Sequence, residues 1–230
     1  MHCGRMPYCA AMFKEFFHKL PGNLAACFSG INLLWLLLAI TLTYVLVTSG
    51  FDWWYYQITR SPKLNWLALA AGGAGFVIPA AVPLGMYLIG RRRANAGLVN
   101  AGAAAGQAVV LASIIASAFK AFTGRTQPVV TYYLAAPSEI DNSREFHFGF
   151  LQNGIFWGWP SSHTAVAFAA TVALVLVSPN KAVKIAAFLF AGFIAVGASV
   201  GFHWISDVAA GVIVGSLIGA VVGKSFQSPT

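Results

Sequence analysis

Charged side chains are scarce in this sequence of 230 residues. Lys, Arg, Asp and Glu together make up 9% of the chain and only 6 residues are acidic, whereas 58% are hydrophobic and the mean hydropathy is +0.73. A soluble domain needs a solvated surface and contains about 25% charged residues. The composition therefore excludes an ordinary soluble protein and indicates that the lipid bilayer surrounds most of the chain.

Cysteine is scarce too, and its placement excludes two further classes of protein. Cys3, Cys9 and Cys27 all precede the first long apolar run, and no cluster of histidines accompanies them. Zinc sites need Cys or His ligands at short spacings, and disulfide frameworks need several cysteines along the chain. We therefore expect reduced thiols. A cleavable signal peptide is not indicated either, because the first apolar run begins only near Ile31.

Six long apolar segments can be drawn, over residues 31–48, 66–89, 98–119, 164–177, 185–202 and 208–222. They predict an all-α polytopic membrane protein, a bundle of six transmembrane helices in one domain at 31–222. The fourth and sixth segments are shorter than the ~20 residues of a full span. Each is expected to begin with the polar motif before it, at the membrane face.

The ends of the chain are expected to lie outside this bundle, as a segment at 1–30 and a tail at 223–230. Phe13, Phe16, Phe17 and Leu20 recur at helical spacing with charged residues between them. This pattern predicts a short helix, either on the membrane surface or packed on the end of the bundle.

The net charge of +8 does not indicate nucleic-acid binding, because the basic residues recur beside apolar runs and do not form a basic domain with interleaved aromatic residues. They predict topology instead. The side with both termini and the loops at 90–97 and 178–184 holds nine, namely Arg5, Lys14, Lys19, Arg91, Arg92, Arg93, Lys181, Lys184 and Lys224. The other side holds five, namely Arg60, Lys63, Lys120, Arg125 and Arg144. Both termini are therefore expected in the cytoplasm.

The opposite side of the membrane then receives the segments at 50–65, 120–162 and 203–207. The first of these contains an aromatic cluster, formed by Phe51, Trp53, Trp54, Tyr55 and Tyr56. Such a cluster favours an interfacial belt over a role in contacting substrate.

Three polar segments interrupt this apolar sequence, and the topology places all of them at helix ends on the non-cytoplasmic side, where they could meet. They lie at 120–128, 160–164 and 203–207. In the third, His203 and Asp207 are four residues apart, a spacing at which a carboxylate on a helix can orient an imidazole and leave its other nitrogen as a nucleophile. The alternative is an interfacial His and an Asp that caps a helix.

The other two segments offer anion-binding groups. Ser161 and Ser162 begin the fourth apolar segment, so a hydroxyl and a free backbone N–H could hold phosphate oxygens, and His163 could move a proton. A capping Ser with an uninvolved His is the alternative. Lys120 and Arg125 supply cations, although each alone is also compatible with an interfacial charge.

Together and in this order, these segments resemble the three motifs of the type 2 phosphatidic acid phosphatase (PAP2) superfamily, which also includes the vanadium haloperoxidases. The resemblance covers residues 66–222. The family's motifs are Lys, six residues and Arg-Pro; Pro-Ser-Gly-His; and Ser-Arg, five residues, His, three residues and Asp. The matching residues are Lys120 and Pro128, then Pro160, Ser161 and His163, then His203 and Asp207.

The resemblance implies a mechanism without a metal or another cofactor. His203 would attack phosphorus to form a phosphohistidine and Asp207 would orient it, while His163 would protonate the leaving oxygen and then activate water. The phosphoryl oxygens would be held by Lys120, Ser161 and the Ser162 amide.

The sequence departs from the family where guanidiniums are expected. Gln127 stands at the Arg position of the first motif, Ser162 replaces the Gly of the second, and Val196 and Gly197 stand at the Ser-Arg positions of the third. We expect Arg125 to compensate by holding phosphate together with Gln127, with Arg144 as a weaker candidate.

These observations predict a lipid phosphatase at the outer face of a bacterial-type inner membrane, acting on a phospholipid, a polyprenyl diphosphate or a lipid A phosphate. The expected partners are a lipid phosphate and the bilayer, and not nucleic acid. One alternative is phosphotransfer from a diester, which the missing arginines favour. A non-catalytic lipid-binding member of the fold is another, and a transporter is disfavoured because no ionisable residue falls in mid-helix.

Overall fold

The computed structural model describes residues 6–128 and 140–227, with side chains described from residue 15 onward. This part of the chain is helical and contains no strand. The elements are α1 (Met6–Cys27), α2 (Asn32–Thr48), α3 (Phe51–Thr59), η1 (Pro62–Leu64), α4 (Asn65–Arg92), α5 (Ala96–Thr123), α6 (Ser162–Val177), α7 (Lys181–Gly201) and α8 (Ile205–Ser225).

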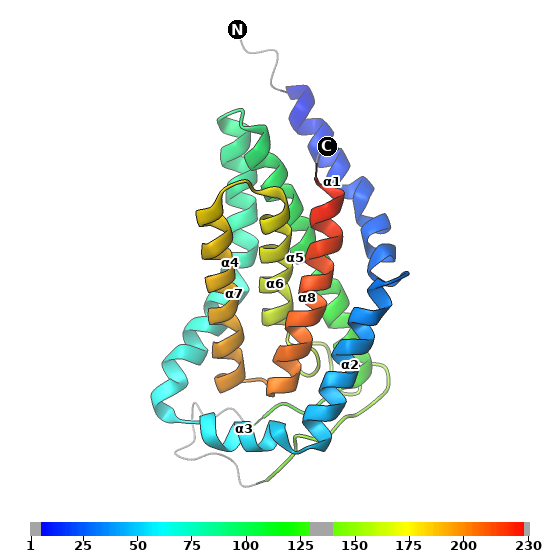
Figure 1. Cartoon of the computed structure of the whole chain (residues 1–230), viewed down its shortest axis with the longest axis vertical. Helices are drawn as coiled ribbons and strands as arrows, with labels where there is room; N and C mark the ends of the chain where they lie inside the picture. Colours follow the sequence, from blue (N-terminus) through cyan, green and yellow to red (C-terminus); the bar gives the residue numbers. More distant parts are fainter. Residues whose placement is uncertain (1–5, 129–139, 228–230) are drawn as a thin grey trace.

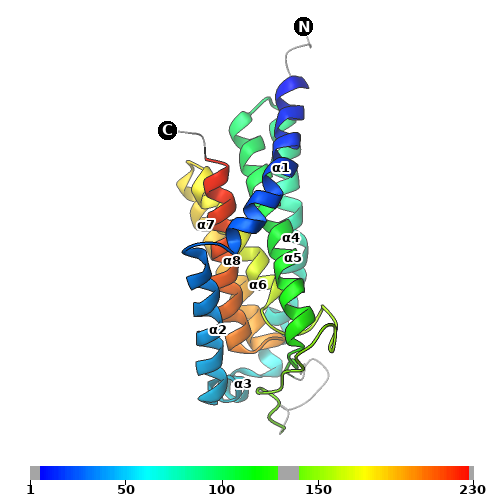
Figure 2. The same cartoon turned by 90° about the vertical axis from the view of Figure 1, so that its right-hand side faces the viewer.

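Helices α4 to α8 run along the long axis of the molecule, and α3 lies across their lower end (Figure 1). The lower part of α4 leans away from the bundle (Figure 1). Helices α1 and α2 cover one side, where α2 packs on α8 (Figure 2). The ends of α5 and α7 and the starts of α6 and α8 therefore share the end of the bundle that α3 crosses.

Small residues bring α6 and α8 into close contact. A Cβ atom on Gly215 would lie 2.3 Å from the carbonyl oxygen of Ala165, and one on Gly219 would lie 2.5 Å from that of Ala169. Any larger residue would push the helices apart. This stripe of glycines is the close packing that small residues permit between membrane helices, and it fixes the start of α8 beside the start of α6.

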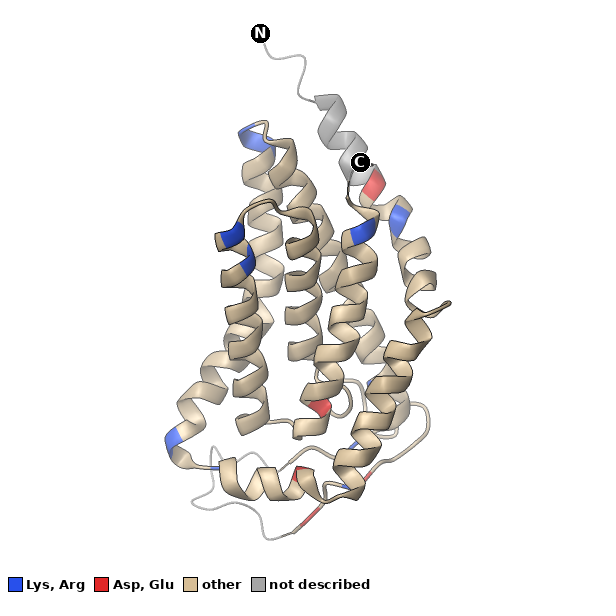
Figure 3. Ribbon diagram, viewed as in Figure 1, with Lys and Arg blue, Asp and Glu red and all other residues tan. Residues whose placement is uncertain are grey.

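The outer faces of the bundle remain apolar. Large hydrophobic side chains are exposed along α2, α4 and α7, for example Leu34, Phe76 and Leu189. Soluble proteins rarely expose apolar surface of this extent. Charged residues gather instead at the two ends of the described bundle (Figure 3). These features indicate a membrane protein.

The expected count of six transmembrane helices is not confirmed. Each of the six apolar segments coincides with a helix, but among the described residues four stretches are long and apolar enough to cross a membrane by themselves, Pro62–Arg92, Ala96–Thr123, Lys181–Gly201 and Ile205–Ser225. A fifth span arises if Glu15–Cys27 and Asn32–Thr48, which bend by 58° at their junction, count as one. Helix α6, with 16 residues, is shorter than a full span.

The amphipathic segment near the N-terminus belongs to a longer helix that packs on the bundle. Phe16 and Leu20 of α1 contact the main hydrophobic core. Asn23 donates to the side-chain oxygen of Gln107 at 2.5 Å and to the Ser225 hydroxyl at 2.9 Å. Of the two alternatives, the structure therefore favours a helix packed on the bundle. The expectations for Cys3 and for the side chains of Cys9 and Phe13 lie outside the described residues.

Candidate functional site

The three polar segments lie together at the end of the bundle that α3 crosses. Helix α5 ends at Gly124, which adopts a left-handed conformation with φ 48° and turns the chain toward Arg125. The backbone N–H of Ser161, at the start of α6, donates to the carbonyl of Asp207 in α8 at 3.0 Å. Arg125 forms an ion pair with Asp207. Residues far apart in the sequence thus form one buried polar site.

His203 lies in the turn between α7 and α8 and points toward Asp207. Its Nδ1 lies 3.4 Å from Oδ2 of Asp207, and both residues are almost fully buried, with His203 2% exposed. The same oxygen accepts from the Trp204 backbone N–H at 3.3 Å, which fixes the carboxylate at the first turn of α8. A carboxylate at Nδ1 leaves Nε2 as the nitrogen available for chemistry.

The environment of His203 keeps its imidazole neutral. Burial, together with the nearby positive charge of Lys120, lowers the pKa of His203 from 6.5 to about 4. The hydrogen bond and charge of Asp207 oppose this shift. A neutral ring carries the free lone pair that a nucleophile requires.

Arg125 is fully buried and bound by two carboxylates. Its Nη2 donates to Oδ2 of Asp52 at 2.6 Å, and its Nη1 forms a short ion pair with Oδ1 of Asp207. Nη1 also donates to the Ser206 hydroxyl, and Nη2 to the Ser143 carbonyl, both at 2.7 Å. Both terminal nitrogens therefore donate within the protein. In this geometry Arg125 binds Asp207 directly, and its expected role as a phosphate ligand stays a prediction.

Asp52 links α3 to the start of α8. Its Oδ1 accepts from the Ser206 backbone N–H at 2.9 Å, and its Oδ2 accepts from the Ser206 hydroxyl at 2.6 Å. Asp52 and Tyr56 are buried, whereas Phe51 and Trp54 on the same helix are exposed. One face of α3 therefore exposes aromatic rings of the kind found in an interfacial belt, and the other face packs against the site.

Arg60, just beyond α3, holds the turn that carries His203. Its Nη1 donates to the Ser199 carbonyl at 3.0 Å and its Nη2 to the His203 carbonyl at 3.3 Å. The guanidinium also lies over the Tyr56 ring, with its carbon 4.8 Å from the ring centroid. Because carbonyls at a helix C-terminus lack helical partners, this buried cation stabilises the end of α7.

Lys120 is a third buried cation at this end. It is 1% exposed, and its Nζ donates to the carbonyls of Phe156 at 3.3 Å and Gly158 at 3.1 Å. These bonds leave Lys120 without a carboxylate at ion-pair distance among the described residues. The role of Lys120 in holding phosphate stays a prediction.

Ser161 acts as the N-cap of α6. Its hydroxyl accepts from the Thr164 backbone N–H at 3.4 Å and shares a hydrogen bond with the Thr164 hydroxyl at 3.1 Å. Ser162 is partly exposed, as is His163. The helix start is thus formed as expected, but the Ser161 hydroxyl already has partners within the protein.

His163 and His203 both lie against Phe202. The His163 ring packs edge-on against Phe202 with 5.0 Å between ring centroids, and the His203 ring lies 5.4 Å from Phe202. His163 also contacts α4, because a Cβ atom on Gly75 would lie 3.1 Å from its Cδ2. The two histidines are therefore neighbours around one aromatic ring, an arrangement that suits a nucleophile and a proton donor.

A profile of the PAP2 superfamily matches residues 101–228, more than half of the chain. This chain belongs to the PAP2 superfamily. Searches of curated proteins and of solved structures give no match. The matched range contains all three polar segments, and PAP2 membership supports phosphatase-type activity in general.

Gln127 and Gly197 stand where the PAP2 motifs carry arginine, and the two residues have different surroundings. At Gln127 the amide nitrogen lies 3.4 Å from Nδ1 of His203, and no described residue is a hydrogen-bond partner of its buried Oε1. Gly197 faces α4, where a Cβ atom would lie 2.1 Å from the Cβ of Ala71. An arginine therefore has no room at Gly197 unless α4 and α7 separate.

Arg144, the weaker candidate cation, lies away from these histidines. It is exposed, and its Nη2 approaches the carbonyl of Thr48 at the end of α2 at 3.5 Å.

Among the described residues, no group of three His, Cys, Asp or Glu side chains is arranged to hold a metal ion.

Asp52 and Arg60 are the site residues that sequence reasoning missed. Arg60 entered only the count of basic residues, and Asp52 was overlooked within an aromatic cluster. One signal was present: an acidic residue in an apolar helix is costly in a membrane unless it has a buried partner. The identity of that partner, 73 residues away in the sequence, needed the fold.

Proposed function

We propose that this PAP2 protein is a membrane enzyme that cleaves a phosphoric ester of a lipid through a phosphohistidine at His203. The observation that carries the proposal is the buried His203–Asp207 pair, in which Nδ1 faces the carboxylate at 3.4 Å. Buried ionisable groups in a membrane protein are costly and are usually functional. A non-catalytic lipid-binding protein would have no need of this pair.

The reaction has two steps. Nε2 of His203 attacks phosphorus, the bond from phosphorus to the leaving oxygen breaks, and His163 gives that oxygen a proton. Water then attacks the phosphohistidine while His163 accepts a proton from it, and the nitrogen–phosphorus bond breaks. Lys120 and the backbone N–H groups at the start of α6 stabilise the charge on the phosphoryl oxygens. No metal ion takes part in this proposal.

Asp207 and its neighbours act through His203. The carboxylate fixes the tautomer of the imidazole and stabilises the positive charge that forms when Nε2 bonds to phosphorus. Arg125 and Asp52 hold Asp207 at the first turn of α8. We assign them positioning roles.

We place the enzyme in the cell membrane of a bacterial type of cell, with both termini in the cytoplasm and the site on the outer side. The excess of Lys and Arg on the terminal side supports this orientation. A phospholipid, a polyprenyl diphosphate or a lipid A phosphate would reach such a site from the outer leaflet.

Turnover by purified protein in detergent micelles tests the proposal. The assay would follow release of the radiolabelled alcohol or phosphate product from a panel of lipid phosphates. His203→Ala should abolish release, whereas Asp207→Asn should leave a weak residual rate because the tautomer is no longer fixed. His147→Ala is the matched control, since His147 is exposed at the same end and its ring shares a hydrogen bond with the Thr126 hydroxyl. Full activity in His203→Ala would remove the proposed mechanism, and lipid binding without turnover in the unaltered protein would support the non-catalytic alternative.

A further inference from the structure

The buried charges of the site leave an excess of one positive charge. Arg60, Lys120 and Arg125 contribute three positive charges, and Asp52 and Asp207 contribute two negative charges. Both carboxylates bind Arg125, so its charge is compensated before any substrate arrives. Lys120, bound to backbone carbonyls, is the buried cation that an incoming phosphate can use.

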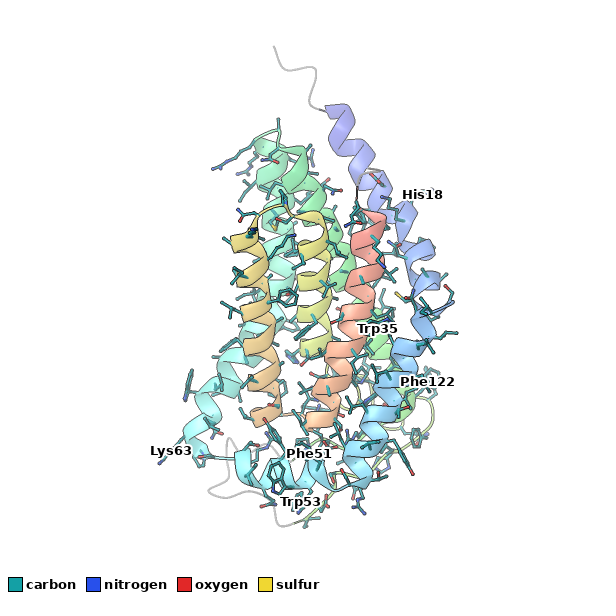
Figure 4. The ribbon with its side chains drawn as sticks, viewed as in Figure 1. His18, Trp35, Phe51, Trp53, Lys63 and Phe122 are labelled. Carbon is teal, nitrogen blue, oxygen red and sulfur yellow. The ribbon has the colours of Figure 1, made fainter. Side chains whose placement is uncertain are left out.

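Other cations on the described part of this end are committed or distant. Arg60 binds the carbonyls of Ser199 and His203. Lys63 lies at the outer edge of the end, beside the start of α4 (Figure 4). Arg144 lies by the end of α2. The segment 129–139 contains no Lys or Arg in its sequence, so it supplies no further cation.

The two positions at which PAP2 motifs carry guanidiniums add no positive charge here. Gly197 packs directly against Ala71 of α4, which leaves no room for a side chain there. Gln127 presents a buried amide oxygen with no partner among the described residues, in the neighbourhood of His203. A carbonyl oxygen repels an anionic phosphate oxygen, but it accepts a hydrogen bond from an alcohol. The position therefore suits an esterified or hydroxyl-bearing group better than a second phosphate charge.

We infer that the site takes a phosphodiester, which carries one negative charge, in preference to a terminal phosphate monoester. A monoester brings close to two negative charges at neutral pH. A buried charge without a partner is strongly disfavoured, and Lys120 can offset one of them. The inference rests on the proposed function, since it names the substrate class of the same site.

The chemistry balances with a diester. Nε2 of His203 attacks phosphorus, one phosphorus–oxygen ester bond breaks, and His163 protonates the alcohol that leaves. The covalent intermediate keeps the second ester group. Attack by water releases a phosphate monoester, whereas attack by another alcohol gives a new diester. The product is therefore an organic phosphate, and inorganic phosphate is not released.

A matched pair of lipids tests the substrate class. Dioleoyl phosphatidate is a monoester, and dioleoyl phosphatidylmethanol is the same lipid with one methyl ester and one charge fewer. Release of diacylglycerol from each lipid, and of methanol from phosphatidylmethanol, would be measured in detergent micelles at neutral pH. We expect kcat/KM for phosphatidylmethanol to exceed that for phosphatidate by at least about tenfold, the minimum effect of an unpaired charge in a desolvated site.

Gln127→Arg supplies the missing charge beside His203 and should shift this ratio toward phosphatidate by about tenfold or more. Gln57→Arg is the control, because Gln57 is exposed on α3 and the same added charge is screened there; it should change the ratio by less than about twofold. Equal or faster cleavage of phosphatidate by the unaltered protein would overturn the inference and leave the proposed function standing. Release of neither diacylglycerol nor methanol from these lipids by folded protein would contradict both.

Discussion

Asp52→Asn tests whether the buried ion pairs hold the site together. Asp52 accepts three hydrogen bonds, from Arg125 at 2.6 Å and from the backbone and hydroxyl of Ser206 at 2.9 Å and 2.6 Å. An asparagine of the same shape can accept from Ser206, but it faces Arg125 either with an NH₂ donor or with an uncharged oxygen. The variant therefore removes one carboxylate and leaves the shape of the site intact.

The size of the effect follows from the burial. Removing one member of a buried ion pair typically costs about 3–5 kcal/mol, and Arg125 retains Asp207, so we expect a loss of about 3 kcal/mol. At roughly 2–4 °C per kcal/mol for a chain of this size, the thermal midpoint should fall by roughly 6–12 °C. Because α8 loses its anchor to α3, kcat should fall more than KM rises.

The assay is thermal unfolding of the purified protein in detergent, followed by tryptophan fluorescence, together with steady-state turnover. Glu15→Gln is the matched control, because it also converts an acid of an ion pair to an amide. Glu15 pairs with Lys19 on one helix and is partly exposed, so it should contribute no more than about 0.5 kcal/mol.

A double-mutant cycle with Arg125→Gln then separates pairing from packing. We expect the combined loss to be smaller than the sum of the single losses by about 2 kcal/mol, because the two groups compensate each other. An unchanged midpoint and unchanged kcat in Asp52→Asn, or strictly additive losses in the cycle, would refute the view that this ion pair positions Asp207.

Three further predictions concern other parts of the structure. Since burial lowers the pKa of His203 from 6.5 to about 4, the imidazole stays neutral between pH 7 and pH 5. The acid limb of kcat/KM for a diester should therefore have its midpoint near pH 4. A midpoint near pH 6.5 would show that His203 titrates as an exposed residue. Gly197→Ala should destabilise the protein by about 1–3 kcal/mol or more by overpacking against Ala71, seen as a lower thermal midpoint, and an unchanged midpoint would show that α4 and α7 are not in close contact. In a Cys-free background, a cysteine at exposed Glu145 should react with a membrane-impermeant maleimide on intact cells and one at exposed Asn180 should not; the reverse pattern would invert the topology.

The apolar runs of the sequence were sufficient to locate α2 and α4 to α8 and to place three polar segments at helix ends, but they did not predict α3. The partners of those polar residues could not be predicted in the same way. Arg125 pairs with Asp52 across 73 residues, and Asn23 bonds to Gln107 across 84, and neither separation has a local signature. The sequence alone therefore does not reveal that two carboxylates bind Arg125.

The packing contact of Gly197 could not be predicted from the sequence either. A glycine in a membrane helix indicates close packing somewhere, but the helix it contacts depends on the orientation of α7 about its axis. The structure places Ala71 of α4 there, which explains why no larger residue stands at this position. The count of membrane spans also depended on more than hydropathy, because α1 and α2 bend at their junction and α6 is short.

The central claim, that His203 is the nucleophile, is tested most directly by trapping the covalent intermediate. Purified protein would be mixed with a lipid substrate labelled at phosphorus, quenched within milliseconds to seconds of mixing, and digested for mass spectrometry. The account predicts a label that is stable in alkali and lost in acid, located on His203 and absent from His203→Ala. A label on any other residue, or undiminished turnover in His203→Ala, would contradict it.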